Sequence, residues 1–262
     1  MQSRSLLILL SALAVTSASP LRRRLCADNG TATEPAAPSS TVSVAYTLPS
    51  TGGATTLPSP GDATLKHIAV GHGIQNYTCT APGANATSLG ALAVLWDVTS
   101  LYPGSGTAAL SDADWTALPP KVLRTTDLPL NLADAASSDA ADVANPFPAP
   151  ASLTVDGLAA PLAFLGHHFF SDTNVPTFDL SGDTAQVQLF SGKKDLGITA
   201  PADSDRGLTD TGAVDWLALS DKGGSENLSL VYRVVTAGGQ PSACTETGQT
   251  ESVAYAAQYW FY

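Results

Sequence analysis

Positive charges are scarce in this chain: 12 Lys and Arg residues stand against 23 Asp and Glu residues, and the formal net charge is -11 at pH 7. The first 24 residues contain four arginines and no acidic residue, so their removal would take the net charge from -11 to -15. An acidic, lysine-poor surface repels phosphate backbones and anionic lipids. We therefore expect no nucleic-acid partner and no membrane partner.

Long apolar runs are also rare, and the one near the start is too short to span a bilayer. The run "LLILLSALAV" follows a single basic residue, Arg4, and leads into the small residues "TSAS". This order is typical of a secretory signal peptide, which we place at residues 1–19. The basic run at 22–24 offers a second processing site. We expect a secreted, extracellular protein without a membrane anchor.

Complete catalytic motifs are missing from the sequence, including G-x-S-x-G, H-E-x-x-H and the phosphate-binding P-loop. The nearest approach is "AVGHGIQNYTC", where Gly71 and Gly73 begin a dinucleotide fingerprint that Asn76 fails to complete. A strand-like segment follows in place of the helix that such a site needs. We interpret the two glycines as a bend or bulge between two strands, and expect no cofactor.

Four N-glycosylation acceptors are present: Asn29, Asn76, Asn85 and Asn227. Together with the signal peptide they predict a glycoprotein. If Asn76 carries a glycan it must face water, and strand alternation then turns Gln75, Tyr77 and Cys79 inward.

The composition divides the mature chain into two parts. Residues 20–62 are rich in Ala, Ser, Thr, Pro and Gly, which predicts a low-complexity leader. Residues 63–262 have the length of one all-β domain, which a second polar stretch at 131–152 interrupts as a long loop.

Within this domain the apolar residues alternate with period two. In "LSLVYRVVT" the alternation places Tyr232 and Val234 on one face and Arg233 on the other, as in a half-buried strand. The last segment, "VAYAAQYWFY", ends the chain as a core strand, and further strands are expected at "LKHIAVG", "ALAVLWD", "APLAFLGHHFF", "AQVQLF" and "AVDWLAL". Turn clusters such as "SGKKD" separate them. The only helix expected is a short one at "SDADWTAL", capped by Ser111. The fold class is therefore all-β, a single antiparallel β-sandwich or barrel with long polar loops.

Six ordered motifs carry a family resemblance. The chain from Leu65 onward contains "LKHIAVGHGIQNYTC", "GHHFF", "PTFDL", "GAVDWLAL", "VYRVVTAGG" and "YAAQYWFY". In this order they resemble the secreted fungal family catalogued as domain of unknown function 3455. Its members are often labelled malate dehydrogenase, so the resemblance implies that activity, but the incomplete glycine loop and the absence of βαβ periodicity argue against it. The resemblance carries no catalytic residue over.

Three cysteines in an exported chain cannot all pair internally. Cys79 lies on the first core segment and Cys244 just before the last one, so we predict a Cys79–Cys244 disulfide. Relatives often place a cysteine after the strand that matches "LAVLWD", where this chain has none. Cys26, in the leader, is then either an unpaired thiol or a link between molecules.

The histidines raise the possibility of a metal or catalytic site. His167 and His168 are neighbours, with Asp172 and Asp179 downstream. Adjacent strand residues point to opposite faces, so both histidines cannot bind one ion from a regular strand. The alternation groups His167 with Phe169 and His168 with Phe170. We expect no metal site. The candidate catalytic residues are His167, His168, Asp172 and Asp179.

These observations favour a secreted, glycosylated, non-catalytic protein of the extracellular space or cell wall. Binding of a glycan or a small ligand through a barrel mouth is one form of this hypothesis, and a cell-wall glycan or an extracellular protein is the expected partner. The alternative is an enzyme of carbohydrate or small-molecule chemistry that uses the His167–Asp179 segment.

Overall fold

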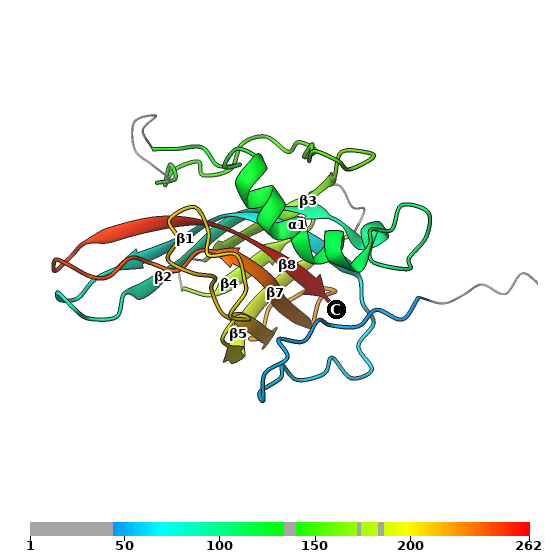
Figure 1. Cartoon of the computed structure of the whole chain (residues 1–262), viewed down its shortest axis with the longest axis horizontal. Helices are drawn as coiled ribbons and strands as arrows, with labels where there is room; N and C mark the ends of the chain where they lie inside the picture. The colour runs from blue at the N-terminus through cyan, green and yellow to red at the C-terminus, as the bar shows by residue number, and fades with distance from the viewer. Residues whose placement is uncertain (1–43, 134–139, 172–173, 183–185) are drawn as a thin grey trace, which may run out of the picture. The chain divides into compact units, whose positions relative to one another are not determined.

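Eight antiparallel strands close into one barrel, in which each strand pairs with its sequence neighbours and β8 returns to pair with β1. This computed structural model describes residues 44–133, 140–171, 174–182 and 186–262, and the barrel lies within the unit Ser43–Tyr262 (Figure 1). The all-β prediction is confirmed, and the closed barrel decides between its two forms.

The strands and helices follow the chain in a simple up-and-down order. Their bounds are β1 His67–Thr78, β2 Thr87–Asp97, η1 Thr99–Leu101 (a 3-10 turn), α1 Asp112–Thr125, β3 Ala163–Phe170, β4 Pro176–Asp179, β5 Leu189–Ile198, β6 Trp216–Asp221, β7 Leu230–Gly238 and β8 Thr250–Phe261. None of the described helices is long and apolar enough to cross a membrane.

Both surfaces of the barrel wall are buried over β1, β7 and β8. On β8, Tyr255, Tyr259 and Phe261 belong to the cluster inside the barrel, while Ala256 and Trp260 belong to a second cluster outside it. The prediction of a half-buried strand at "LSLVYRVVT" was therefore wrong. A helix covers the outer face of this strand, and the face that carries Arg233 lines the barrel interior.

Helix α1 supplies that cover, and it is longer than predicted. Ser111 caps it as expected, since its hydroxyl accepts a hydrogen bond from the Asp114 backbone nitrogen at 3.1 Å. The helix then continues through Pro119 and Pro120, because its buried side chains pack on β1, β7 and β8. Pro119 cannot donate to the carbonyl of Trp115. The side chain of Gln258 donates to it instead, at 3.0 Å.

Gly71 and Gly73 lie inside the single strand β1, so the prediction of a bend between two strands was wrong. Their role is to make room. A Cβ atom on Gly71 would come within 2.7 Å of the Tyr259 ring, and one on Gly73 would collide with the Leu92 carbonyl oxygen. The register between β1 and β2 shifts between Asn76 and Tyr77, because Leu89 is an extra residue in β2.

Two details of the strand prediction also differ from the structure. The segment "SGKKD" was expected to be a turn but lies within β5, where a bulge between Lys194 and Leu196 absorbs the irregular sequence. The short strand β4 was not predicted, because four residues are too few to show alternation. Pairing with β3 on one side and β5 on the other holds these four residues in a strand.

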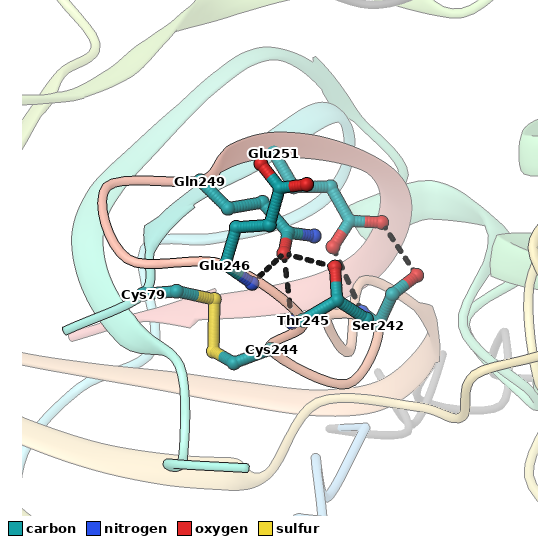
Figure 2. The surroundings of a disulfide bond; sticks show 7 residues. All are labelled: Cys79, Ser242, Cys244, Thr245, Glu246, Gln249 and Glu251. Atoms are coloured by element: carbon teal, nitrogen blue, oxygen red, sulfur yellow. Dashed lines mark hydrogen bonds between the residues drawn. A yellow bond between two sulfur atoms is a disulfide. The ribbon is translucent and has the colours of Figure 1, made fainter. Parts of the chain in front are cut away.

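The structure joins Cys79 to Cys244, the pair predicted from their positions (Figure 2). Side-chain acceptors hold the loop around Cys244. The Gln249 side-chain oxygen accepts from the Thr245 and Glu246 backbone nitrogens, and the Glu251 carboxylate accepts from the backbone and the hydroxyl of Ser242. The disulfide thus fixes the segment that leads into β8 against the end of β1. Cys26 lies outside the described residues.

Candidate functional site

A cavity of about 370 Å³ occupies one end of the barrel interior. Odd-numbered strands run toward this end and even-numbered strands start from it, because consecutive strands are antiparallel. The cavity is thus lined from β1 to β8, and its wall includes Gln75, Ala91, His168, Phe170, Arg233 and Tyr259. Its volume is within the range of small-molecule sites, roughly 300–1,000 Å³.

Arg233 on β7 is the buried charge of this cavity and is 8% exposed. Its cross-strand neighbours are Leu217 on β6 and Tyr259 on β8. Its Nε and Nη2 atoms both donate to the backbone carbonyl of Asp215, at 3.1 and 2.9 Å. Among the described residues, no carboxylate lies within ion-pair distance of the guanidinium.

Two tyrosines lie beside this arginine. The hydroxyls of Tyr255 and Tyr259 are 2.7 Å apart, and both side chains are buried. Burial raises the pKa of both hydroxyls, and the charge of Arg233 opposes that rise. Burial likewise raises the pKa of Tyr77 to about 12, while its hydroxyl donates to the Gly239 carbonyl at 2.8 Å. The tyrosines are therefore neutral donors and acceptors at physiological pH.

Gln75 completes the polar part of the wall. Its side chain is buried, and its amide nitrogen makes no hydrogen bond of acceptable geometry with any described residue. The amide does lie close enough to the Tyr255 hydroxyl to lower its pKa slightly. A buried donor without a well-placed acceptor costs on the order of 1–3 kcal/mol. Gln75 therefore offers a donor at the cavity wall.

The aromatic part of the wall is built around His168. Its ring stacks on Phe178 with centroids 4.0 Å apart, and it lies 5.7 Å from the Phe170 ring. Its Nδ1 atom donates to the Thr177 carbonyl at 2.8 Å, so the neutral ring carries its proton there. Burial, with a smaller contribution from the charge of Arg233, lowers the pKa of His168 to about 3 against the opposing effect of the Thr177 hydrogen bond. His168 is thus an uncharged aromatic surface at neutral pH.

The rim of the cavity carries charges of both signs. Lys194 is exposed and Asp215 is half-buried, and both line the opening. Next to Arg233, a bulge in β7 between Val234 and Ala237 places Val235 at a φ of 47°. A β-branched residue rarely adopts such a φ, which costs roughly 1–3 kcal/mol. The bulge changes the direction of β7 just beyond Arg233.

His167 lies on the other side of the barrel wall, as the alternation predicted. It stacks on Phe147 with centroids 4.1 Å apart and lines a separate outer cavity of about 420 Å³. It is paired in register with Asp179, but no hydrogen bond joins the two side chains. Asp179 instead accepts from the backbone nitrogen of Ser181. Asp172 lies outside the described residues.

The other two histidines, His67 and His72, do not line the barrel cavity. The Nδ1 atom of His67 lies 2.8 Å from an Asp97 carboxylate oxygen; burial raises the pKa of that carboxyl group, but this hydrogen bond and those from Thr99 lower it overall. His72, on the outer face of β1, contacts the Thr126 hydroxyl, and burial lowers its pKa to about 4. Among the described residues, no three His, Cys, Asp or Glu side chains gather as a metal site would require.

The glycosylation acceptors differ in their surroundings. Asn85 is exposed, and Asn76 is half-buried with its side-chain oxygen accepting from the Ser252 hydroxyl. Asn227 is exposed, but its amide nitrogen donates to the Val187 carbonyl at 2.7 Å. Asn29 lies outside the described residues. Glycosylation therefore stays a prediction, with Asn85 as the least encumbered acceptor.

The family model described as "Protein of unknown function (DUF3455)" matches residues 59–262, which is most of the chain and all eight strands. The chain belongs to this DUF3455 family. The resemblance drawn from the six motifs is thereby confirmed. No curated protein and no solved structure matches the chain.

Sequence reasoning missed most of this cavity. It selected His168, which does line it, but grouped that residue with Asp172 and Asp179. A signal for Arg233 was present: the run "LVYRVV" has apolar residues on both sides of the arginine, which is typical of a strand with both faces buried. An arginine in such a strand must point into the protein.

Proposed function

We propose that this DUF3455 protein is a secreted, non-catalytic protein that binds a small ligand in the interior of its barrel. The observation that carries the proposal is the cavity around Arg233, where buried polar side chains and an aromatic wall meet at the open end of the strands. Small-ligand sites combine a largely apolar lining with a few placed polar groups. Barrel mouths are one of their common locations.

Secretion is part of the proposal, and two features support it. The N-terminal segment has the order of a signal peptide. The Cys79–Cys244 disulfide suits an oxidising compartment, because cytosolic thiols are kept reduced. A protein released from the cell would meet its ligand in the extracellular space or the cell wall.

Uptake of an uncharged fluorescent probe tests the cavity. N-phenyl-1-naphthylamine fluoresces when it leaves water for an apolar site, and we expect the mature protein to bind one molecule per chain. Replacement of Ala91, which is 4% exposed and lines the cavity, by Trp should fill the space. We expect Ala91→Trp to weaken probe binding by at least about tenfold, the effect of blocking a site that buries most of its ligand.

Leu89→Trp is the matched control, since Leu89 lies on the same strand but is 52% exposed and does not line this cavity. It should bind the probe as the parent does. Circular dichroism would establish that both variants are folded. A parent protein that takes up no probe, or equal binding by a folded Ala91→Trp variant, contradicts the proposal.

A further inference from the structure

We infer that the ligand of this cavity is a small organic carboxylate, whose anionic group binds Arg233 while its apolar part lies against the aromatic wall. The inference rests on the proposed ligand cavity and names the chemical class of its occupant. It follows from three properties of the described residues: a buried cation without a carboxylate partner, a buried amide donor without a well-placed acceptor on the same cavity wall, and an aromatic surface opposite.

The first property is the charge balance of the interior. Arginine side chains are effectively always protonated in proteins, so the buried guanidinium of Arg233 carries a positive charge. Burying a cation costs several kcal/mol unless an anion or enough acceptors offset it. The only geometrically good acceptor that the described chain provides is the Asp215 carbonyl. The neighbouring His168, Tyr255 and Tyr259 are neutral, so a bound anion would supply the missing charge.

The second property is the supply of hydrogen-bond donors. Arginine has five N–H donors in a fixed planar fork. Two of them go to Asp215, and the Tyr259 hydroxyl lies close enough to interact with the guanidinium. Donors therefore remain on Arg233 and on the Gln75 amide nitrogen. A carboxylate has two charged oxygens that can accept from such donors at the same time, whereas an alcohol or ether has one neutral oxygen.

The third property is the surface opposite the guanidinium. His168, Phe170 and Phe178 form this aromatic wall on β3 and β4, while Leu217 and Leu219 extend the apolar lining on β6, directly beside Arg233. Tyr259, next to Arg233, reaches to within 5.9 Å of the His168 ring. A ligand that is anionic at one end and aromatic or aliphatic at the other fits both walls. A neutral sugar would leave the charge of Arg233 without a counterion.

The rim does not account for the preference. Lys194 and Asp215 lie at the same opening with opposite charges, so they offset each other for an entering anion. The side chains of both residues lie near Gly197, where a Cβ atom would be 3.8 Å from Lys194 Cδ and 3.7 Å from Asp215 Oδ2. The net positive charge of the cavity therefore comes from Arg233 in its interior.

Calorimetric titration with paired probes tests the inference. Phenylacetate and hexanoate are each compared with their uncharged amides, phenylacetamide and hexanamide, on the mature protein at pH 7.5. We expect each carboxylate to bind at least about tenfold more tightly than its amide, because charged hydrogen bonds are roughly twice as strong as neutral ones. Equal affinities for acid and amide would overturn the inference.

Arg233→Met removes the charge and keeps much of the side-chain length. We expect this variant to lose the preference for carboxylates while still binding the uncharged naphthylamine probe. Arg206→Met is the matched control, since Arg206 is exposed and pairs with Asp210 away from the cavity. It should keep the preference. Retention of the preference in folded Arg233→Met would equally overturn the inference.

If Arg233→Met does not fold, the parent protein still decides the matter. The side-chain Nε resonance of Arg233, assigned by its absence in Arg233→Lys, should shift on addition of phenylacetate and stay in place with phenylacetamide. An identical response to both probes contradicts the inference. Binding of the naphthylamine without any preference for carboxylates leaves the proposed cavity intact and rejects only the anionic ligand. Failure of all probes rejects both.

Discussion

Three polar side chains that face the barrel interior, Gln75, His168 and Arg233, are each at most 8% exposed. Burying polar groups without full hydrogen bonding lowers stability. Apolar residues of similar size would fill the same positions at less cost, as they do at the other end of the barrel around Phe190 and Phe261. The polar end is therefore better explained by ligand binding than by folding.

His168 should also make the protein sensitive to acid. Its pKa is about 3 in the folded protein against an ordinary 6.5, so between these values the unfolded chain binds a proton that the native chain does not. Acidification through this window therefore favours unfolding, by up to about 1.4 kcal/mol per pH unit. We expect His168→Phe to reduce the loss of stability between pH 6.5 and 4, measured by urea unfolding at each pH.

His72→Phe provides a comparison at a second buried histidine, whose pKa of about 4 gives a window from 6.5 down to 4. The two effects should add, because His72 contacts Thr126 outside the barrel and His168 lies inside it. An unchanged acid dependence in both folded variants would show that these histidines are not the groups that titrate.

At the scale of single elements, local sequence decides less than the neighbouring strands do. The alternation in β8 was sufficient to predict a core strand at the end of the chain, and most of this strand is buried. The sequence did not predict the full length of α1, because Pro119 and Pro120 are unfavourable inside a helix. The buried face of α1 and a hydrogen bond from a β8 side chain stabilise the helix at these positions. The sequence pattern also failed for "SGKKD" in β5, where pairing with β6 overrides residues that favour a turn.

The candidate site shows the same limit. His168 could be selected from the sequence because histidine is a common catalytic residue. Arg233, which lines the same cavity, lies on β7, more than sixty residues away. Which face of β7 is internal depends on barrel closure and on the helix that covers its outside. The period-two pattern of β7 predicts neither barrel closure nor the covering helix.

Gln258 should be the residue on β8 that makes the prolines of α1 tolerable. It is fully buried, donates to the Trp115 carbonyl, and accepts from the Trp260 indole at 3.4 Å. We expect Gln258→Leu to lower the free energy of unfolding by about 2 kcal/mol, because both groups lose their buried partner. Urea unfolding at pH 7 measures this difference.

Pro119→Ala is the background that isolates the helix part of this effect. An alanine at this position has the backbone N–H that can donate to the Trp115 carbonyl. We expect Gln258→Leu to cost about 1 kcal/mol less in this background, a coupling that a double-mutant cycle measures. Equal costs in the two backgrounds would mean that Gln258 does not substitute for the missing helical hydrogen bond.

At the scale of the whole unit, barrel closure depends on segments far apart in the chain. β1 and β8 pair along their full length, from His67 with Phe261 to Thr78 with Thr250. The disulfide joins the same two regions, and its cysteines are separated by 165 positions in the sequence. It lies at the end of the barrel where the cavity opens, since Cys79 follows β1 and Cys244 precedes β8. Stability and ligand binding should therefore both depend on it.

The Cys79→Ala/Cys244→Ala double variant tests this dependence. Chain entropy predicts a loss of about 5 kcal/mol in the free energy of unfolding for a loop of this length, less any structure that the unfolded chain retains. Both cysteines are at most 6% exposed, so in the native parent protein the bond should resist reductant until the mouth of the barrel opens. Because Gln249 and Glu251 still hold the Ser242–Glu246 loop by hydrogen bonds, we expect the variant to fold at 25 °C, unfold at lower temperature, and bind the naphthylamine probe more weakly. Cys26→Ala should match the parent protein in both measurements. An unchanged melting temperature in the double variant would mean that β1–β8 pairing alone sets the stability of the barrel, and that the disulfide only holds the loop beside its mouth.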